Sequence, residues 1–180
     1  HSHYAGQIGG LGGKNTNNLA KETDLAIAIG TKLADFTTGS WANFENENFK
    51  LVSINVSRFD ANKHLAQAVV GDAKVSLDEL SLALGNWKAE DEWNNKSQKE
   101  LQEWDKHIDQ ESAPTNQEIP SYVQAVGAIY RNSDPTDIAV TAAGGLVGEV
   151  AQVWRPRELN THETESVSYT HLRAHETQTH

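Results

Sequence analysis

Short apolar runs bounded by glycine or polar residues recur along the first half of the chain. The run Leu-Ala-Ile-Ala-Ile at 25–29 ends at Gly30, which is typical of a buried strand in a parallel sheet. Helical spacing near residue 80 stops at Gly85, as a helix end should. The pattern predicts strands at 25–29, 51–56 and 68–70, and helices at 14–22 and 75–84. Alternating strands and helices indicate an α/β fold around a parallel sheet.

A polar stretch then separates this region from a second set of apolar segments. Leu101, Trp104 and Ile108 share one helix face at spacing i, i+3, i+7. We therefore interpret 86–120 as a linker that contains one amphipathic helix. Beyond it, the pattern predicts a helix at 122–130, a strand at 138–140 and the start of a helix at 148–154. These elements indicate the opening of a second α/β unit.

Composition narrows the possible functions. The 180 residues include 25 acidic and 15 basic ones, for a net charge of −10. This charge argues against a nucleic-acid scaffold and against binding to an anionic membrane. The chain contains no cysteine, which excludes a disulfide framework and a cysteine nucleophile. It has no apolar run of about 18 residues, so no spanning helix is predicted.

The two ends of the chain are unusual. The chain contains no methionine and begins His1-Ser2-His3, so we expect it to be a piece of a longer protein. The tail at 166–180 has few apolar residues and resembles translated sequencing adapter, so we expect it to be non-native and poorly packed. His171 and His175 within it are spaced i, i+4, but no third ligand is placed by the sequence. No metal site is therefore predicted.

Two glycine-rich segments could bind phosphate. The segment at 6–13 lacks the last glycine of a dinucleotide fingerprint and has no strand before it, so its spacing favours a flexible loop. Gly144 and Gly145 follow a predicted strand and precede a predicted helix, where backbone N–H groups can hold an anion. A plain tight turn is the alternative for this pair.

The loop at 35–41 follows the first predicted strand. Loops after the carboxyl ends of parallel strands are where α/β proteins bind ligands. Its hydroxyl groups could bind a polyol or a carboxylate, and the alternative is helix capping by Thr38 or Ser40. No catalytic residue is assigned from the sequence.

Three motifs in this order resemble one known family. Asp-Phe-Thr-Thr-Gly-Ser at 35–40, Ile-Asn-Val-Ser-Arg-Phe-Asp-Ala at 54–61 and Thr-Ala-Ala-Gly-Gly-Leu at 141–146 resemble the thiamine-diphosphate enzymes built like acetolactate synthase. The resemblance implies a partial, Rossmann-like central domain with a parallel sheet, followed by the start of a second α/β cofactor-binding domain. Its implied limits are 1–85 for the central domain, 86–120 for the linker, 121–165 for the start of the diphosphate domain and 166–180 for the non-native tail.

The resemblance also implies a site. Gly144, Gly145 and Leu146 would lie close to the diphosphate, and Thr38 and Gly39 would bind substrate. Val147 departs from the proline that the family usually has there. The implied cofactors are thiamine diphosphate and Mg²⁺, with the activating glutamate and the Mg²⁺ ligands outside this chain. We therefore expect the chain alone to be inactive.

Within the family, the likeness is greatest to enzymes of inositol breakdown. These hydrolyse a carbon–carbon bond of a cyclic polyhydroxy-1,2-dione to give 5-deoxyglucuronate, which implies a small-molecule substrate. The resemblance further implies a cytoplasmic homodimer or homotetramer. Two alternatives stay open. One is an acetolactate synthase or a 2-oxo acid decarboxylase, and the other is a non-catalytic nucleotide-binding or oligomerisation module.

Overall fold

The computed structural model describes residues 3–142 and 144–164. The chain divides into two compact units, His1–Gln102 and Glu103–His180, called unit 1 and unit 2 below. The boundary falls inside the predicted linker at 86–120. The predicted non-native tail, with His171 and His175, lies outside the described residues. Within the described part of the chain, no helix combines the length and the apolar character needed to cross a membrane.

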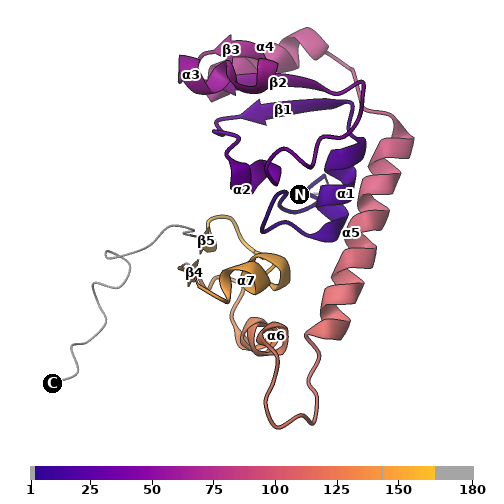
Figure 1. Ribbon diagram of the computed structural model, residues 1–180, viewed down its shortest axis with the longest axis vertical. Coiled ribbons are helices and arrows are strands. Elements are labelled where there is room, and N and C mark those ends of the chain that lie inside the picture. The colour runs from indigo at the N-terminus through magenta and orange to yellow at the C-terminus, as the bar shows by residue number, and fades with distance from the viewer. Residues whose placement is uncertain (1–2, 143, 165–180) are drawn as a thin grey trace, which may run out of the picture. The chain divides into compact units, whose positions relative to one another are not determined.

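Unit 1 is built on a parallel three-stranded sheet (Figure 1). Its strands β1 (Leu25–Ile29), β2 (Lys50–Asn55) and β3 (Gln67–Val70) lie side by side in the order β1-β2-β3. Ile29 pairs with Ile54, and Ile54 with Val69. The α/β class with parallel strands is therefore confirmed, and the predicted strand limits agree to within one residue.

Helices lie before, between and after the strands of unit 1 in the chain. They are α1 (Lys14–Glu22), α2 (Asp35–Thr38), α3 (Arg58–Ala61), α4 (Ala73–Leu84) and η1 (Lys63–Leu65). The helix α1 has the predicted limits. The helix α4 begins two residues before its predicted start, because the Asp72 carboxylate caps it by accepting a hydrogen bond from the Val75 N–H at 3.0 Å. As predicted, α4 ends at Gly85.

One hydrophobic cluster of unit 1 lies on a single face of its sheet. Ala28 and Leu51 from the strands are buried with Leu33, and Trp41 and Phe49 pack against them. Alternate residues of β1 point to opposite faces of the sheet. On its other face, Leu25, Ile27 and Ile29 remain 47%, 42% and 41% exposed. The small side chains of β1 therefore face this cluster, and its large ones lie on the opposite face, where Ile54 of β2 is buried.

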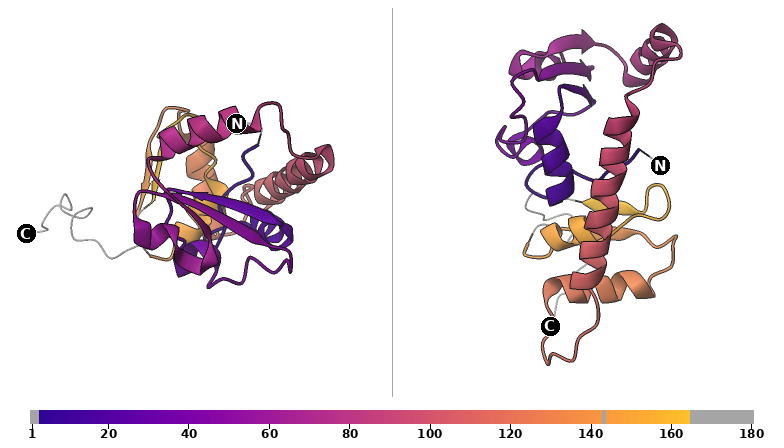
Figure 2. Two further views of the ribbon diagram at one scale, coloured as in Figure 1. Left: turned by 90° about the horizontal axis from the view of Figure 1, so that it is seen from above. Right: turned by 90° about the vertical axis from the view of Figure 1, so that its right-hand side faces the viewer.

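Unit 2 contains a short parallel strand pair and two helices that follow the long helix α5 (Asp91–Glu111). The elements are α6 (Tyr122–Asn132), β4 (Ala139–Thr141), α7 (Val147–Val153) and β5 (His162–Thr164). Figure 2 shows α5 as one continuous helix. The predicted helix at 148–154 and the predicted strand at 138–140 are each observed within one residue. The strand β5 was not predicted.

The core of unit 2 brings α5, α6 and α7 together through Ile108, Val126, Val150, Val153 and Trp154. A Cβ placed on Gly127 of α6 would lie 2.5 Å from the Ser112 Cβ. The glycine that weakens the helical pattern of 122–130 therefore allows a close approach between two segments.

Candidate functional site

A hollow of about 480 Å³ opens at the carboxyl end of β4 in unit 2. Its lining includes Tyr122, Thr141, Gly144, Gly145, Leu146 and Val150. Ligand pockets for small molecules usually measure about 300–1,000 Å³, so a cofactor-sized group can fit here. The position also agrees with the rule that α/β folds bind ligands beyond the carboxyl ends of their strands.

The glycine loop after β4 borders open space. Gly144 has a φ of +147°, a backbone conformation that residues with side chains rarely adopt. A Cβ on Gly144 would meet no heavy atom within 4 Å, and one on Gly145 would come no closer than 3.9 Å to Tyr122 Cε2. The absence of side chains here therefore leaves room for a ligand, rather than for a neighbouring segment of the protein.

The donor set of the hollow fits a diphosphate in part. Thr141 and Tyr122 bring hydroxyl groups, and the loop brings backbone N–H groups, which bind phosphate oxygens well. The described lining residues include no charged side chain. The helix α7 has seven residues, so its dipole adds little field. A diphosphate would thus need a metal ion for charge balance, and the described residues contain no cluster of three or more metal-ligating side chains.

A line of polar side chains leads away from the hollow along the two strands. The hydroxyl of Thr141 lies 3.3 Å from that of Thr164, and the Thr164 hydroxyl lies 2.9 Å from His162 Nε2. Burial lowers the pKa of His162, and the nearby carboxylate of Glu163 opposes that shift. Sequence reasoning missed these partners and Tyr122. Thr164 and His162 reach Thr141 only because β4 pairs with β5, and Tyr122 lines the hollow only because of the position of α6.

Gly144, Gly145 and Leu146 line one hollow, and their predicted place beside the diphosphate stays a prediction. Thr38 and Gly39 lie in unit 1. Thr38 is 2% exposed, and its hydroxyl donates to the Ala34 carbonyl at 3.3 Å and accepts from the Trp41 N–H at 3.1 Å. Gly39 ends α2 in the left-handed conformation. These are local hydrogen bonds of the α2 turn, and the helix N-cap that was the alternative for Thr38 is not formed, since α2 has Ala34 as its N-cap. The substrate-binding role of both residues stays a prediction.

The glycine-rich loop at 6–13 is not the loose segment that its spacing predicts. The Gly10 N–H donates to the Phe36 carbonyl at 2.7 Å, and the Gly9 N–H donates to Asn17 Oδ1 at 2.8 Å. A Cβ on Gly9 would lie 2.0 Å from the Phe36 carbonyl oxygen. This loop therefore packs directly against the loop at 35–41.

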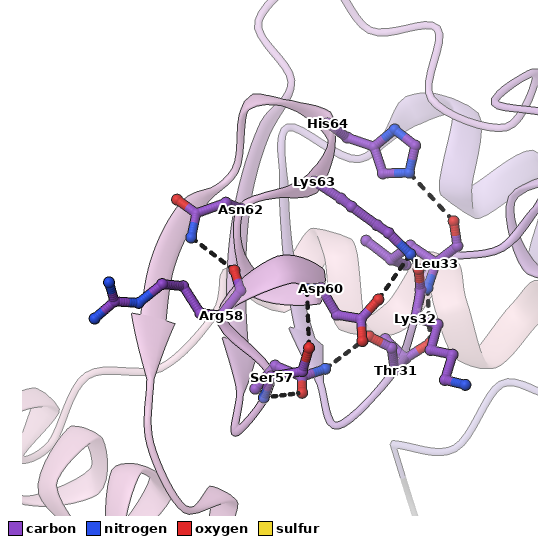
Figure 3. A network of polar contacts seen from close by, with 10 residues as sticks. Thr31, Lys32, Leu33, Ser57, Arg58, Asp60, Asn62, Lys63 and His64 are labelled. Carbon is purple, nitrogen blue, oxygen red and sulfur yellow. Dashed lines mark hydrogen bonds and ion pairs between the residues drawn. The ribbon is translucent and has the colours of Figure 1, made fainter.

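A second polar network lies at the carboxyl edge of the unit 1 sheet (Figure 3). Lys63 Nζ forms an ion pair with Asp60 at 2.7 Å and donates to the Lys32 carbonyl at 3.2 Å. The hydrogen bond from Lys63 is the main reason why the pKa of Asp60 lies below its usual range. The Ser57 hydroxyl, which caps α3, accepts a further bond from the Asp60 N–H at 3.3 Å. Lys63 thus ties the loops after β1 and β2 together.

The same edge carries several strained residues. His64 has a φ of +55°, its ring stacks on Trp41 with centroids 4.0 Å apart, and its Nε2 lies 3.2 Å from the Leu33 carbonyl oxygen. Leu33 and Trp41 also have positive φ, at +46° and +70°. Such strain persists where surrounding contacts fix the backbone. Here the stacking and the polar network supply those contacts.

Comparison with known proteins identifies the class. Residues 1–80 match the family model for the central domain of thiamine pyrophosphate enzymes. Residues 1–80 therefore belong to the thiamine pyrophosphate enzyme family, in agreement with the resemblance carried by the motifs at 35–40 and 54–61.

Individual relatives within the family share one activity. The chain is 33% identical over 92% of its length to a 3D-(3,5/4)-trihydroxycyclohexane-1,2-dione hydrolase of Bacillus anthracis. It is 30% identical over 89% of its length to the enzyme of the same name from Clostridium tetani, and 32% identical over 86% to that from Clostridium perfringens. These alignments cover 28–29% of the relatives' own length, so the chain spans under a third of them. Because they cover most of the chain, they extend beyond residue 80.

Proposed function

We propose that this chain forms part of a thiamine-diphosphate-dependent enzyme that hydrolyses a carbon–carbon bond of trihydroxycyclohexane-1,2-dione in inositol catabolism. The observation that carries the proposal is the identity of 30–33% with hydrolases of that name along about nine-tenths of the chain. The likeness continues past the central domain into the segment that contains the glycine loop and the hollow.

The residues at the hollow have a definite role in this proposal. Gly144, Gly145 and Leu146 hold the diphosphate at the hollow, with their backbone N–H groups as donors and Thr141 as a hydroxyl partner. When bound, the cofactor supplies an electron sink for cleavage of the carbon–carbon bond. Mg²⁺ balances the diphosphate charge through ligands outside the described residues. The protein's own task at the hollow is to bind and orient.

Thr38 and Gly39 are proposed to contact the substrate. A threonine hydroxyl has one donor and two acceptor positions, and the two observed bonds of Thr38 use the donor and one acceptor. One acceptor position therefore remains for a hydroxyl group of the substrate. Because Thr38 is nearly fully buried, such a contact needs the α2 turn to open locally.

An exchange of segments tests the substrate class. The aligned segment of the Bacillus anthracis hydrolase is replaced by the matching residues of this chain, and the hybrid is assayed with the cyclic dione and with pyruvate. We expect dione hydrolysis with thiamine diphosphate and Mg²⁺, and no acetolactate or decarboxylation product. A hybrid that makes acetolactate or decarboxylates pyruvate, and leaves the dione intact, would contradict the proposal.

The isolated 180-residue chain provides a second test. We expect it to be inactive, because the described residues include no activating glutamate in the hollow and no metal cluster. A ligand that binds only the folded chain should still raise its melting temperature. Thiamine diphosphate should do so, and FAD and NAD should not. A shift with NAD alone would favour the nucleotide-binding module instead.

The cellular setting follows from the family resemblance. We propose a homodimer or homotetramer in the cytoplasm, and no nucleic-acid partner, in keeping with the net charge of −10. Sedimentation of the assembled enzyme measures its oligomeric state, and a monomer would contradict the proposed homodimer or homotetramer.

A further inference from the structure

Three side chains form a hydrogen-bonded line that ends at the hollow. The parallel pairing of β4 with β5 places Thr141 beside Thr164 and Ala139 beside His162. The Thr141 and Thr164 hydroxyls are 3.3 Å apart, and Thr164 Oγ1 is 2.9 Å from His162 Nε2. Thr141 lines the hollow, whereas His162 stands at the far end of the line. The imidazole is therefore two hydrogen bonds away from the Thr141 hydroxyl, and three from a ligand in the hollow.

The direction of these bonds depends on His162. Each hydroxyl carries one proton, so the hydrogen bonds along a line of hydroxyls all run in one direction or all in the opposite direction. If Nε2 accepts, Thr164 gives its proton to the ring, and its oxygen takes the proton of Thr141. If Nε2 carries a proton, the order reverses, and Thr164 donates to Thr141. The Thr141 proton is then available to the hollow.

The competing contact of Thr141 is weak. Its hydroxyl lies 3.5 Å from the Glu163 carbonyl oxygen, which is at the long limit for a hydrogen bond. An anionic oxygen accepts more strongly than a carbonyl does, so a ligand in the hollow would take the proton instead.

We infer that His162 is a positioning residue that determines, through Thr164 and Thr141, whether the hollow presents a hydroxyl donor to a diphosphate oxygen. This inference rests on the proposed function, in which the hollow takes the diphosphate. A protonated His162 requires the donor order, whereas the neutral ring allows either order. Diphosphate binding should therefore strengthen as the pH falls through the titration of His162.

The surroundings of His162 favour such a response. The strand packed beside it, β4, carries no titratable side chain, and Glu163 on its own strand is the charged group that acts on it. Burial lowers its pKa, so the ring is neutral near pH 7 in the absence of ligand. By linkage, an anion that prefers the protonated state raises the pKa of His162 in return.

The test measures binding of inorganic pyrophosphate to the full 180-residue chain by calorimetry at about pH 5 and about pH 8, on either side of the ordinary histidine pKa. His162→Gln is the matched variant, because the glutamine amide can donate from nearly the same position at both pH values. Pyrophosphate titrates too, but its own protonation affects every variant equally and cancels in the comparison.

We expect the wild-type chain to gain about tenfold more affinity than His162→Gln on going to the lower pH, the size of one hydrogen bond to a charged group. Thr164→Val should abolish this extra gain, and Thr164→Ser, which keeps the hydroxyl, should retain it. The NMR titration of the His162 ring should shift to higher pH when pyrophosphate is added to wild type, and not in Thr141→Val.

Each other outcome has a definite meaning. If wild type binds pyrophosphate with the same pH dependence as His162→Gln and Thr164→Val, the role of His162 is overturned while the hollow keeps its diphosphate. If wild type binds no pyrophosphate at either pH, the proposed function of the hollow is overturned, and this inference with it. The Thr164→Ser variant shows whether any loss reflects the missing hydroxyl or disturbed packing.

Discussion

The two glycine-rich loops of this chain use the same residue for opposite purposes. In unit 1, a Cβ on Gly9 would lie 2.0 Å from a backbone oxygen, and one on Gly12 would lie 2.5 Å from another. In unit 2, a Cβ on Gly144 would meet nothing within 4 Å. The first loop lacks side chains because the protein's own backbone fills the space. The second lacks them at the border of a hollow.

This difference distinguishes a glycine required by packing from a glycine that borders open space. A glycine required by packing should matter for stability and not for binding. A glycine that leaves room for a ligand should matter for binding and leave stability almost unchanged. Glycine spacing alone does not distinguish these two kinds of glycine, so the sequence offers both loops as candidate phosphate sites.

The largest expected effect is on the stability of unit 1. Gly9→Ala should destabilise it by about 3 kcal/mol or more, because the new Cβ would collide with the Phe36 carbonyl and because Gly9 has a φ of +92°. Denaturation by urea, followed by circular dichroism, measures the change. Gly10→Ala is the control, since its Cβ would sit 3.4 Å from the Phe36 ring, and it should cost less than about 1 kcal/mol. Equal effects of the two changes would show that the loop is not packed as described.

The next effect is on ligand binding by unit 2. Gly145→Ala should weaken pyrophosphate binding by about tenfold or more, because its methyl group enters the space of the ligand. It should change the unfolding free energy by less than about 0.5 kcal/mol, since its Cβ would come no closer than 3.9 Å to Tyr122. Gly148→Ala, whose Cβ also meets no heavy atom within 4 Å, is the matched control in α7 and should bind as wild type does. Loss of stability rather than affinity in Gly145→Ala would remove the contrast between the loops.

A smaller effect is expected where the packed loop of unit 1 meets α2. Thr38→Val keeps the volume of the side chain but removes both hydrogen bonds of its hydroxyl, at a cost of about 1 kcal/mol. Thr38→Ser should restore most of that stability. In the hybrid enzyme, a higher KM for the dione in Thr38→Val, measured with the same amount of folded enzyme, would support substrate binding by Thr38. An unchanged KM would leave Thr38 with its structural role alone.

Local signals account for the elements that the sequence predicted correctly. The run at 25–29 lies between Asp24 and Gly30, so both ends of β1 are marked by polar or flexible residues. The start of α6 is fixed by a capping box in which Ser121 and Gln124 exchange hydrogen bonds. Such features depend on neighbours in sequence and can be recognised without a structure.

Distant contacts account for what was missed. The strand β5 reads His-Glu-Thr, which has no apolar pattern, and it forms only by pairing with β4. The packing of Gly9 depends on Phe36, which is far away along the chain. At the site, Gly144 and Gly145 are neighbours in sequence, whereas Tyr122 lines their hollow, and His162 reaches Thr141 through Thr164, only in the fold. Spacing could not have identified either residue.

The smallest expected effect is a pH dependence of stability, and it allows stability and ligand binding to be compared within unit 2. The pKa of His162 is lowered by burial in the folded chain, so between that value and the ordinary 6.5 the unfolded chain binds more protons. Stability contributed by this group is therefore fully present above about pH 6.5 and is lost as the pH falls through the folded pKa. Urea denaturation of wild type and His162→Gln across this range measures this effect, and the difference between their unfolding free energies should decline as the pH falls.

Pyrophosphate binding should strengthen over the same pH range, because acid protonates the ring that directs Thr141 toward the ligand. As the pH falls, stability should therefore decrease while pyrophosphate affinity increases, because folding favours the neutral ring of His162 and the ligand favours the protonated one. A decrease or an increase of both together would contradict this account of His162.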